Sequence, residues 1–195
     1  NSLAFTSANA VLTDVTVSGN LLDLSFNNVT VLDDITISAT MRNLTVTNND
    51  ELTAFDVSDA SIADITFTSN EDITSVTFDH TANTAYVQDG DGHNSTDFVF
   101  TGNVDVTSLT YSGEDVATFQ VTGNTALATV DFSGVTSVDS TTLDAVDIDV
   151  SGNNLVAASI TETSEDDTEG TIDDGTSGMS TIVDLLVAAA AENTS

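Results

Sequence analysis

The sequence predicts an all-β fold, specifically a β-solenoid of about seven coils that ends in a short helical or extended segment. Apolar residues alternate with Thr, Ser and Asp along most of the chain, which is the period of a β-strand. A pattern centred on asparagine recurs at a spacing of 21 residues, which is typical of stacked repeats. Hydrophobic residues make up 39% of the 195 residues, enough to form a core despite the high charge.

Each repeat has an alternating apolar pair, two spacers, an asparagine, two more spacers and a second apolar set. The clearest copy runs from Leu44 and Val46 through Asn49 to Leu52 and Phe55. The asparagines that mark successive copies are Asn49, Asn70, Asn103, Asn124 and Asn153. They are separated by 21, 33, 21 and 29 residues, so insertions of 12 and 8 residues interrupt a 21-residue unit. We therefore expect two short parallel strands per coil, with the inserted loops on one side.

The upstream sequence keeps the apolar spacing, with Val29 in the asparagine position, and brings the expected number of coils to about seven. The half-unit, apolar-x-x-apolar-x-apolar-x-x-Asn, resembles the leucine-rich-repeat motif, in particular the 21-residue repeats of bacterial surface proteins. The resemblance covers residues 10–161, although Val, Ile and Phe stand where that family favours Leu. It implies a role in surface adhesion or partner binding. We expect the five asparagines to stack at one corner, where their amides bond the backbone of adjacent coils.

The composition divides the chain into three parts. Residues 1–161 form the solenoid, and residues 162–178 form an acidic linker rich in Gly, Ser and Thr. Residues 179–195 form an apolar segment that either caps the last coil or docks as an arm on a neighbouring subunit. The residues expected to mediate assembly through this segment are Ile182, Val183, Leu185, Leu186 and Val187.

The charge balance excludes several functions. One Arg stands against 32 acidic residues, giving a net charge of −31, so neither nucleic acid nor an anionic membrane is an expected partner. The chain has no Cys and no Lys, which excludes thiolate and Schiff-base catalysis. Arg42 is the only Arg available to stabilise a developing negative charge, and no carboxylate pair stands apart from the general acidic surface. We therefore do not expect an enzyme.

The sequence indicates no cofactor with certainty, and calcium is the first candidate. The first insertion carries Asp89, Asp91 and Asp97 around a Gly-rich turn, and calcium takes six to eight oxygen ligands from flexible loops of this kind. A plain solvated loop is the first interpretation of this insertion, and the calcium site is the alternative to it. His80 and His93 flank the same insertion and offer a transition-metal alternative. The acidic stretch 162–176 is a further candidate for calcium, at a contact between subunits.

The function we expect is that of a structural subunit, which assembles with copies of itself into an extracellular filament, appendage or surface layer. The alternative is an adhesive module of a larger cell-surface protein, with a surface glycan or protein as partner. Both place the chain outside the cell, in a saline environment that screens its charge.

Ice binding is a third reading. Rows of Thr such as Thr45 and Thr47 resemble those of ice-binding solenoids. We expect these rows to be broken by Asp56, Val99, Gln120 and Asp131.

Overall fold

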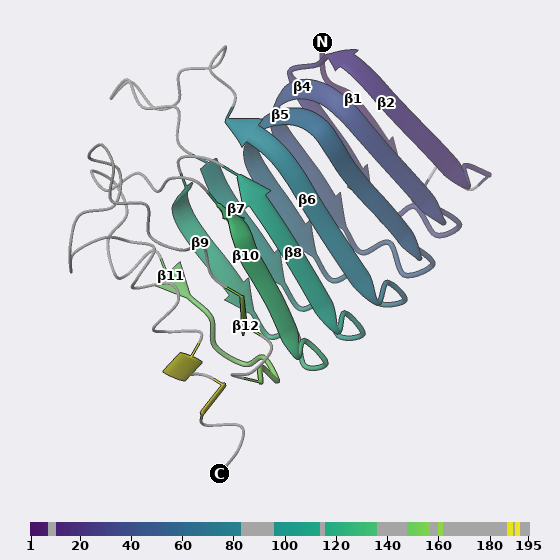
Figure 1. Ribbon diagram of the computed structural model, residues 1–195. Coiled ribbons are helices and arrows are strands. Elements are labelled where there is room, and N and C mark those ends of the chain that lie inside the picture. The colour runs from purple at the N-terminus through teal and green to yellow at the C-terminus, as the bar shows by residue number, and fades with distance from the viewer. Residues whose placement is uncertain are drawn as a thin grey trace, which may run out of the picture.

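The computed structural model of this chain is a solenoid of stacked β-strands (Figure 1). It describes residues 1–7, 11–82, 96–113, 116–135, 148–156, 160–161, 187–188 and 190–191. The strands are β1 (Leu3–Thr6), β2 (Asp14–Asn20), β3 (Asp23–Asn27), β4 (Asp34–Thr47), β5 (Ala54–Thr68), β6 (Ser75–Ala82), β7 (Thr96–Thr101), β8 (Ser108–Gly113), β9 (Val116–Thr122), β10 (Thr129–Val135), β11 (Ile148–Asp149) and β12 (Ile160–Thr161). The predicted all-β solenoid is confirmed.

Neighbouring coils pair their strands in parallel and form two faces. Face 1 is the row β1, β3, the second half of β4, the second half of β5, β7, β9 and β11. Face 2 is the row β2, the first half of β4, the first half of β5, β6, β8, β10 and β12. Strands β6, β8 and β10 of face 2 lie in front in Figure 1.

The solenoid has about five turns, where the sequence predicted about seven. The difference lies at the ends, because pairing in the last coil shrinks to the two-residue strands β11 and β12, and the first coil contributes only the four residues of β1 to face 1. A second difference concerns the expected two short strands per coil. In β4 and β5 the two strands are continuous and bend from face 2 to face 1 at a register shift, since no insertion separates them.

The core lies between the two faces. Leu44 and Val46 point inward from face 1, and Ile35 and Ile37 point inward from face 2; all four are buried. Aromatic rings continue the packing from coil to coil, as in the residues Phe67, Phe78, Phe98, Phe100, Phe119 and Phe132. Burial of each such side chain contributes roughly 1.5–3 kcal/mol, so the apolar alternation is the main source of stability.

The two faces meet at two corners. At the asparagine corner, tight turns lead from face 1 to face 2 and follow one another along the lower right of Figure 1. At the insertion corner, the chain passes from face 2 back to face 1. Both long insertions lie at this second corner, between β6 and β7 and between β10 and β11. The predicted placement of the inserted loops on one side of the stack therefore agrees with the strands that flank them.

Near the C-terminus, residues 187–188 and 190–191 are helical. Val187 is exposed, whereas Ala190 is fully buried and belongs to the hydrophobic core. Within the described residues, none of the helical segments has the length and apolar character needed to cross a membrane.

Candidate functional site

A ladder of asparagine side chains runs along the asparagine corner. Each Asn Oδ1 accepts a hydrogen bond from the backbone N–H of the preceding ladder residue. Where that residue is also Asn, the same Oδ1 accepts a second bond from its Nδ2. For Asn103 these bonds come from Asn70, at 3.0 Å from N and 3.3 Å from Nδ2. Each Nδ2 also donates to a backbone carbonyl of the preceding coil, as Asn103 does to Phe67 O at 3.1 Å. The structure brings together all the asparagines named from the sequence, namely Asn49, Asn70, Asn103, Asn124 and Asn153.

The first and last described positions of the ladder differ from the central ones. At its start Val29 has no side-chain amide, and its backbone N–H donates to Asn49 Oδ1 at 3.0 Å. At its finish Asn153 turns its Nδ2 back to Val150 O at 2.8 Å, in addition to Val121 O. Four of the five side chains are completely buried, so these bonds satisfy polar groups that water does not reach. The ladder therefore has a structural role along the stack.

The residue before each ladder position has a left-handed backbone, which our sequence reasoning did not find. The residues in this position are Asn28, Asn48, Ser69, Gly102, Gly123 and Gly152, with φ between 54° and 73°. Glycine and asparagine adopt this conformation at low cost. A Gly or Asn directly before most of the ladder positions was therefore a readable signal of a tight turn.

The outward side of face 1 carries a patch without charge. Two columns of outward residues run across β3, β4, β5, β7 and β9 in register. Their members are Ser25, Thr45, Thr66, Val99 and Gln120 in one column and Asn27, Thr47, Thr68, Thr101 and Thr122 in the other. We call these ten residues the uncharged patch. In a chain of net charge −31, such a patch is unusual and marks a candidate binding surface.

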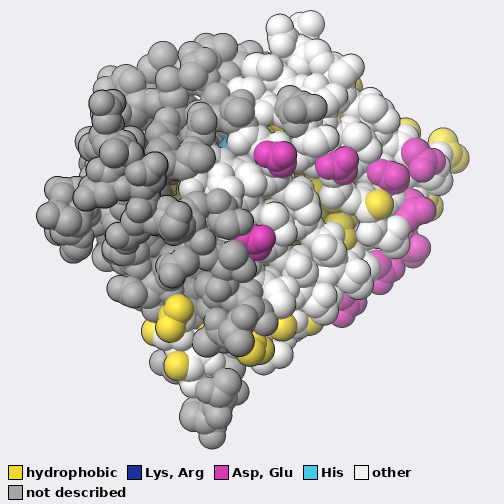
Figure 2. All heavy atoms as spheres, viewed as in Figure 1, with side chains coloured by type: hydrophobic (Ala, Val, Ile, Leu, Met, Phe, Trp, Pro, Cys, Tyr) yellow, Lys and Arg dark blue, Asp and Glu magenta, His cyan; other side chains and the backbone are white. Residues whose placement is uncertain are grey.

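Face 2 differs from face 1. Its central outward column contains Thr16, Thr36, Asp56, Thr77, Thr110 and Asp131. Acidic side chains are spread over this side of the molecule and along the edge formed by the turns (Figure 2). From the sequence, Asp56 and Asp131 were expected to interrupt the Thr rows, without assignment to a particular face. They interrupt the row on face 2 only, whereas Val99 and Gln120 lie in the uncharged patch.

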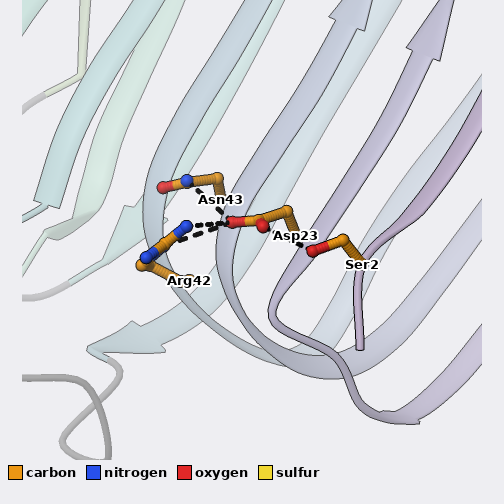
Figure 3. Close-up of polar contacts among 4 residues, drawn as sticks. All are labelled: Ser2, Asp23, Arg42 and Asn43. Carbon is orange, nitrogen blue, oxygen red and sulfur yellow. Dashed lines mark hydrogen bonds and ion pairs between the residues drawn. The ribbon is translucent and has the colours of Figure 1, made fainter.

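The single Arg of the chain neutralises a carboxylate beside the uncharged patch (Figure 3). Arg42 Nη2 lies 2.7 Å from Asp23 Oδ1, to which Asn43 Nδ2 also donates at 2.9 Å. The Ser2 hydroxyl donates to the other oxygen of Asp23 at 2.6 Å. The Ser2 bond is the largest cause that lowers the pKa of Asp23, against its desolvation, and Arg42 and Asn43 lower the pKa further. Asp23 therefore stays ionised and paired.

A buried polar pair lies near the insertion corner. His80 Nε2 lies 3.0 Å from the hydroxyl oxygen of Tyr111, and both residues are buried. Burial raises the pKa of Tyr111 far above its ordinary value. A Cβ at Gly113 would lie 2.9 Å from both polar atoms, so this position has no room for a larger residue. The pair is thus part of the packing.

The predicted metal and assembly residues are largely outside the described part of the chain. Asp89, Asp91 and His93 lie there, as do the acidic stretch 162–176 and the assembly residues Ile182, Val183, Leu185 and Leu186. Asp97 is described and lies on the outer side of face 1, in register with Asp64. Among the described residues, no group of three or more His, Asp or Glu could hold a metal ion.

The N-terminal end of the solenoid exposes apolar side chains. Val11 is 93% exposed and Leu3 is 40% exposed. Phe5 stacks on Phe26 with ring centroids 4.9 Å apart and is only partly buried, as is Val15. Within the described residues, β1 pairs with β3 alone and β2 with β4 alone, so each has a second edge without a strand.

Comparison with known proteins adds no relative. No family model, curated protein or solved structure matches this chain.

Proposed function

We propose that this protein is a structural subunit that assembles with copies of itself outside the cell, through the N-terminal end of the solenoid. The observation that carries the proposal is that this end combines two strand edges with exposed apolar side chains. An open strand edge offers a row of backbone donors and acceptors that a further strand can pair with. Partly exposed core residues next to such edges favour association, because a neighbour would bury them.

The two strand edges and the exposed apolar residues all belong to the first coil of the stack. Strands β1 and β2 belong to the first coil, one on each face, and the side chains of Phe5 and Val15 pack from these strands onto the core. A second copy seated here would extend both faces and bury Leu3, Phe5 and Val15 together. The strands of the second copy would pair with β1 and β2 in either a parallel or an antiparallel ladder, with backbone hydrogen bonds on both faces.

The charge of the chain sets the conditions for assembly. Copies of net charge −31 repel one another, and this repulsion falls when salt shortens the range of the interaction to about 8 Å at physiological ionic strength. We therefore propose a saline exterior as the working environment. Calcium is a second route to the same end, because it neutralises carboxylates on two copies.

The test measures assembly of the purified chain in saline, in saline with calcium and in saline with a chelator. Negative-stain electron microscopy and sedimentation velocity report particle shape and mass. We expect filaments or larger oligomers of the wild type and loss of them in Val11→Asp. Val104→Asp is the matched control, because Val104 is also exposed but lies in the middle of the stack, between β7 and β8.

Two results would overturn the proposal. Monodisperse single chains under all three conditions would contradict self-assembly and favour the adhesive module. Equal loss of assembly in Val11→Asp and Val104→Asp would show that added charge, and not the N-terminal end, controls association.

A further inference from the structure

The uncharged patch on face 1 is separate from the N-terminal end, so self-assembly through that end does not account for it. Thr, Ser, Asn, Gln and Val fill all ten of its positions, although acidic residues outnumber basic ones by 32 to 1 in the chain. Six of the ten residues are Thr, each with a hydroxyl and a methyl group. The patch is therefore both hydrogen-bonding and partly apolar, and its ten residues carry no formal charge.

The patch is also regular. Its columns continue through five strands with every partner in register, and the register shifts of β4, β5 and β7 fall outside it. Strands are about 4.8 Å apart, and outward residues repeat about every 6.6 Å along a strand, so the hydroxyls form a two-dimensional lattice. Figure 1 shows the strands running in nearly the same direction along the stack. Neighbouring strands that twist little relative to one another form a nearly flat sheet.

Neighbouring side chains hold one another in place. Thr101 Oγ1 and Thr122 Oγ1 are hydrogen-bonded at 3.1 Å across β7 and β9. The Thr side chains of the patch are half-buried between their neighbours. β-Branched side chains have restricted χ1 rotamers, so fixing these hydroxyls costs little entropy. Water bound to them would occupy fixed positions rather than a mobile layer.

These properties exclude some classes of ligand and favour another. A charged ligand finds no counter-charge in the patch, and a glycan finds no outward aromatic ring to stack on. A flat lattice of hydroxyl and methyl groups matches instead a ligand that is itself neutral, rigid and periodic and offers both donors and acceptors. We propose that the uncharged patch binds the surface of ice, with the Thr columns Thr45–Thr66 and Thr47–Thr68–Thr101–Thr122 as the contact.

The pairing of Asp23 with Arg42 compensates one charge beside the patch. Asp23 lies in the column next to the patch, in register with Asn43. Its charge is compensated there by Arg42 at 2.7 Å and satisfied by Asn43. The same column continues through Asp64 and Asp97, so the compensation by Arg42 applies to the N-terminal end of this column.

The test is incorporation into slowly growing polycrystalline ice, measured as the ratio of protein in the ice to protein in the remaining liquid. The wild-type chain is expected to be enriched in the ice. Thr68→Asp, in the centre of the patch, lowers the ratio about tenfold, the change that corresponds to about 1.4 kcal/mol of contact free energy. Thr36→Asp is the matched control, because it adds the same charge to a central Thr of face 2 and leaves the ratio unchanged.

A second variant tests whether a loss of incorporation results from misfolding. Thr68→Tyr keeps a residue that is favoured in strands but breaks the flat surface, and its melting temperature shows whether the solenoid is intact. A folded Thr68→Tyr is expected to lose incorporation as well. Val11→Asp keeps incorporation, so this result is independent of self-assembly.

Three outcomes would overturn the proposal: exclusion of the wild type from ice, equal loss in Thr68→Asp and Thr36→Asp, and full incorporation of folded Thr68→Tyr. If the wild type is excluded from ice and Thr68→Asp instead lowers the sedimenting mass, the patch is a contact with a second copy of the chain.

Discussion

The two corners of the solenoid join the same coils in different ways. At the asparagine corner, side chains from Asn49 to Asn153 bond the coil before and the coil after, and no insertion lies within these turns. At the insertion corner, contacts are apolar, as with Ile62, or join one pair of neighbouring coils, as between His80 and Tyr111, and the chain length varies from coil to coil. A continuous polar ladder fixes turn geometry, because a missing partner would leave buried polar groups without hydrogen bonds. A corner without one tolerates insertions.

The largest expected effect is loss of a central ladder side chain. Asn103→Ala removes bonds from Asn70 and to Phe67 and Asn124, and leaves buried donors and an acceptor without partners. The free energy of unfolding should fall by about 3–5 kcal/mol, measured by urea denaturation. Asn154→Ala is the control, because Asn154 is exposed at the same corner and its side chain is outside the ladder. Equal small losses in both variants would contradict a stabilising ladder.

An intermediate effect is expected at the insertion corner. Tyr111→Phe removes the hydroxyl that bonds His80, so the free energy of unfolding at neutral pH should fall by about 1–2 kcal/mol.

The same variant also changes the pH dependence. Because burial raises the pKa of Tyr111 above 10.0, the protonated hydroxyl stabilises the fold fully below pH 10. This contribution declines above pH 10 by about 1.4 kcal/mol per pH unit, until the pKa of the folded state is reached. The chain contains no Lys, which makes alkaline titration simple to interpret. In urea denaturation between pH 9 and 11, the wild type should lose stability more steeply than Tyr111→Phe; parallel curves would be the contrary result.

The smallest effect concerns the turn before the ladder. Ser69 has φ 54°, a left-handed conformation in which the equivalent Gly102 and Gly123 are unstrained. Ser69→Gly should raise the free energy of unfolding by about 0.5 kcal/mol, since relief of strain exceeds the added entropy of the unfolded chain. Ser38→Gly, at an exposed strand position, should instead lower it. Thermal denaturation compares the two, and a destabilised Ser69→Gly would show that the turn is not strained.

Much of the architecture could be predicted from local patterns. Alternation places Leu44 and Val46 inside and Thr45 outside, because successive side chains in a strand point to opposite faces. The constant step around each asparagine predicts stacking, since equal repeats place equal residues side by side. The number of turns was overestimated, because the same spacing near the chain ends does not show whether pairing is long enough to complete a coil. The left-handed residues were overlooked although Gly102, Gly123 and Gly152 precede ladder positions.

The sequence by itself determined which side chains point inward, where the coils repeat and that copies of the chain repel one another through their charge. The tertiary structure alone decided which outward residues share a face. Asp56 and Thr66 are both outward residues of β5, yet the bend of that strand places Asp56 on face 2 and Thr66 in the uncharged patch. It likewise brought Arg42 to Asp23 and His80 to Tyr111. The physical reason is that alternation is a property of adjacent residues, whereas the identity of a face depends on where each coil bends and on how the coils stack.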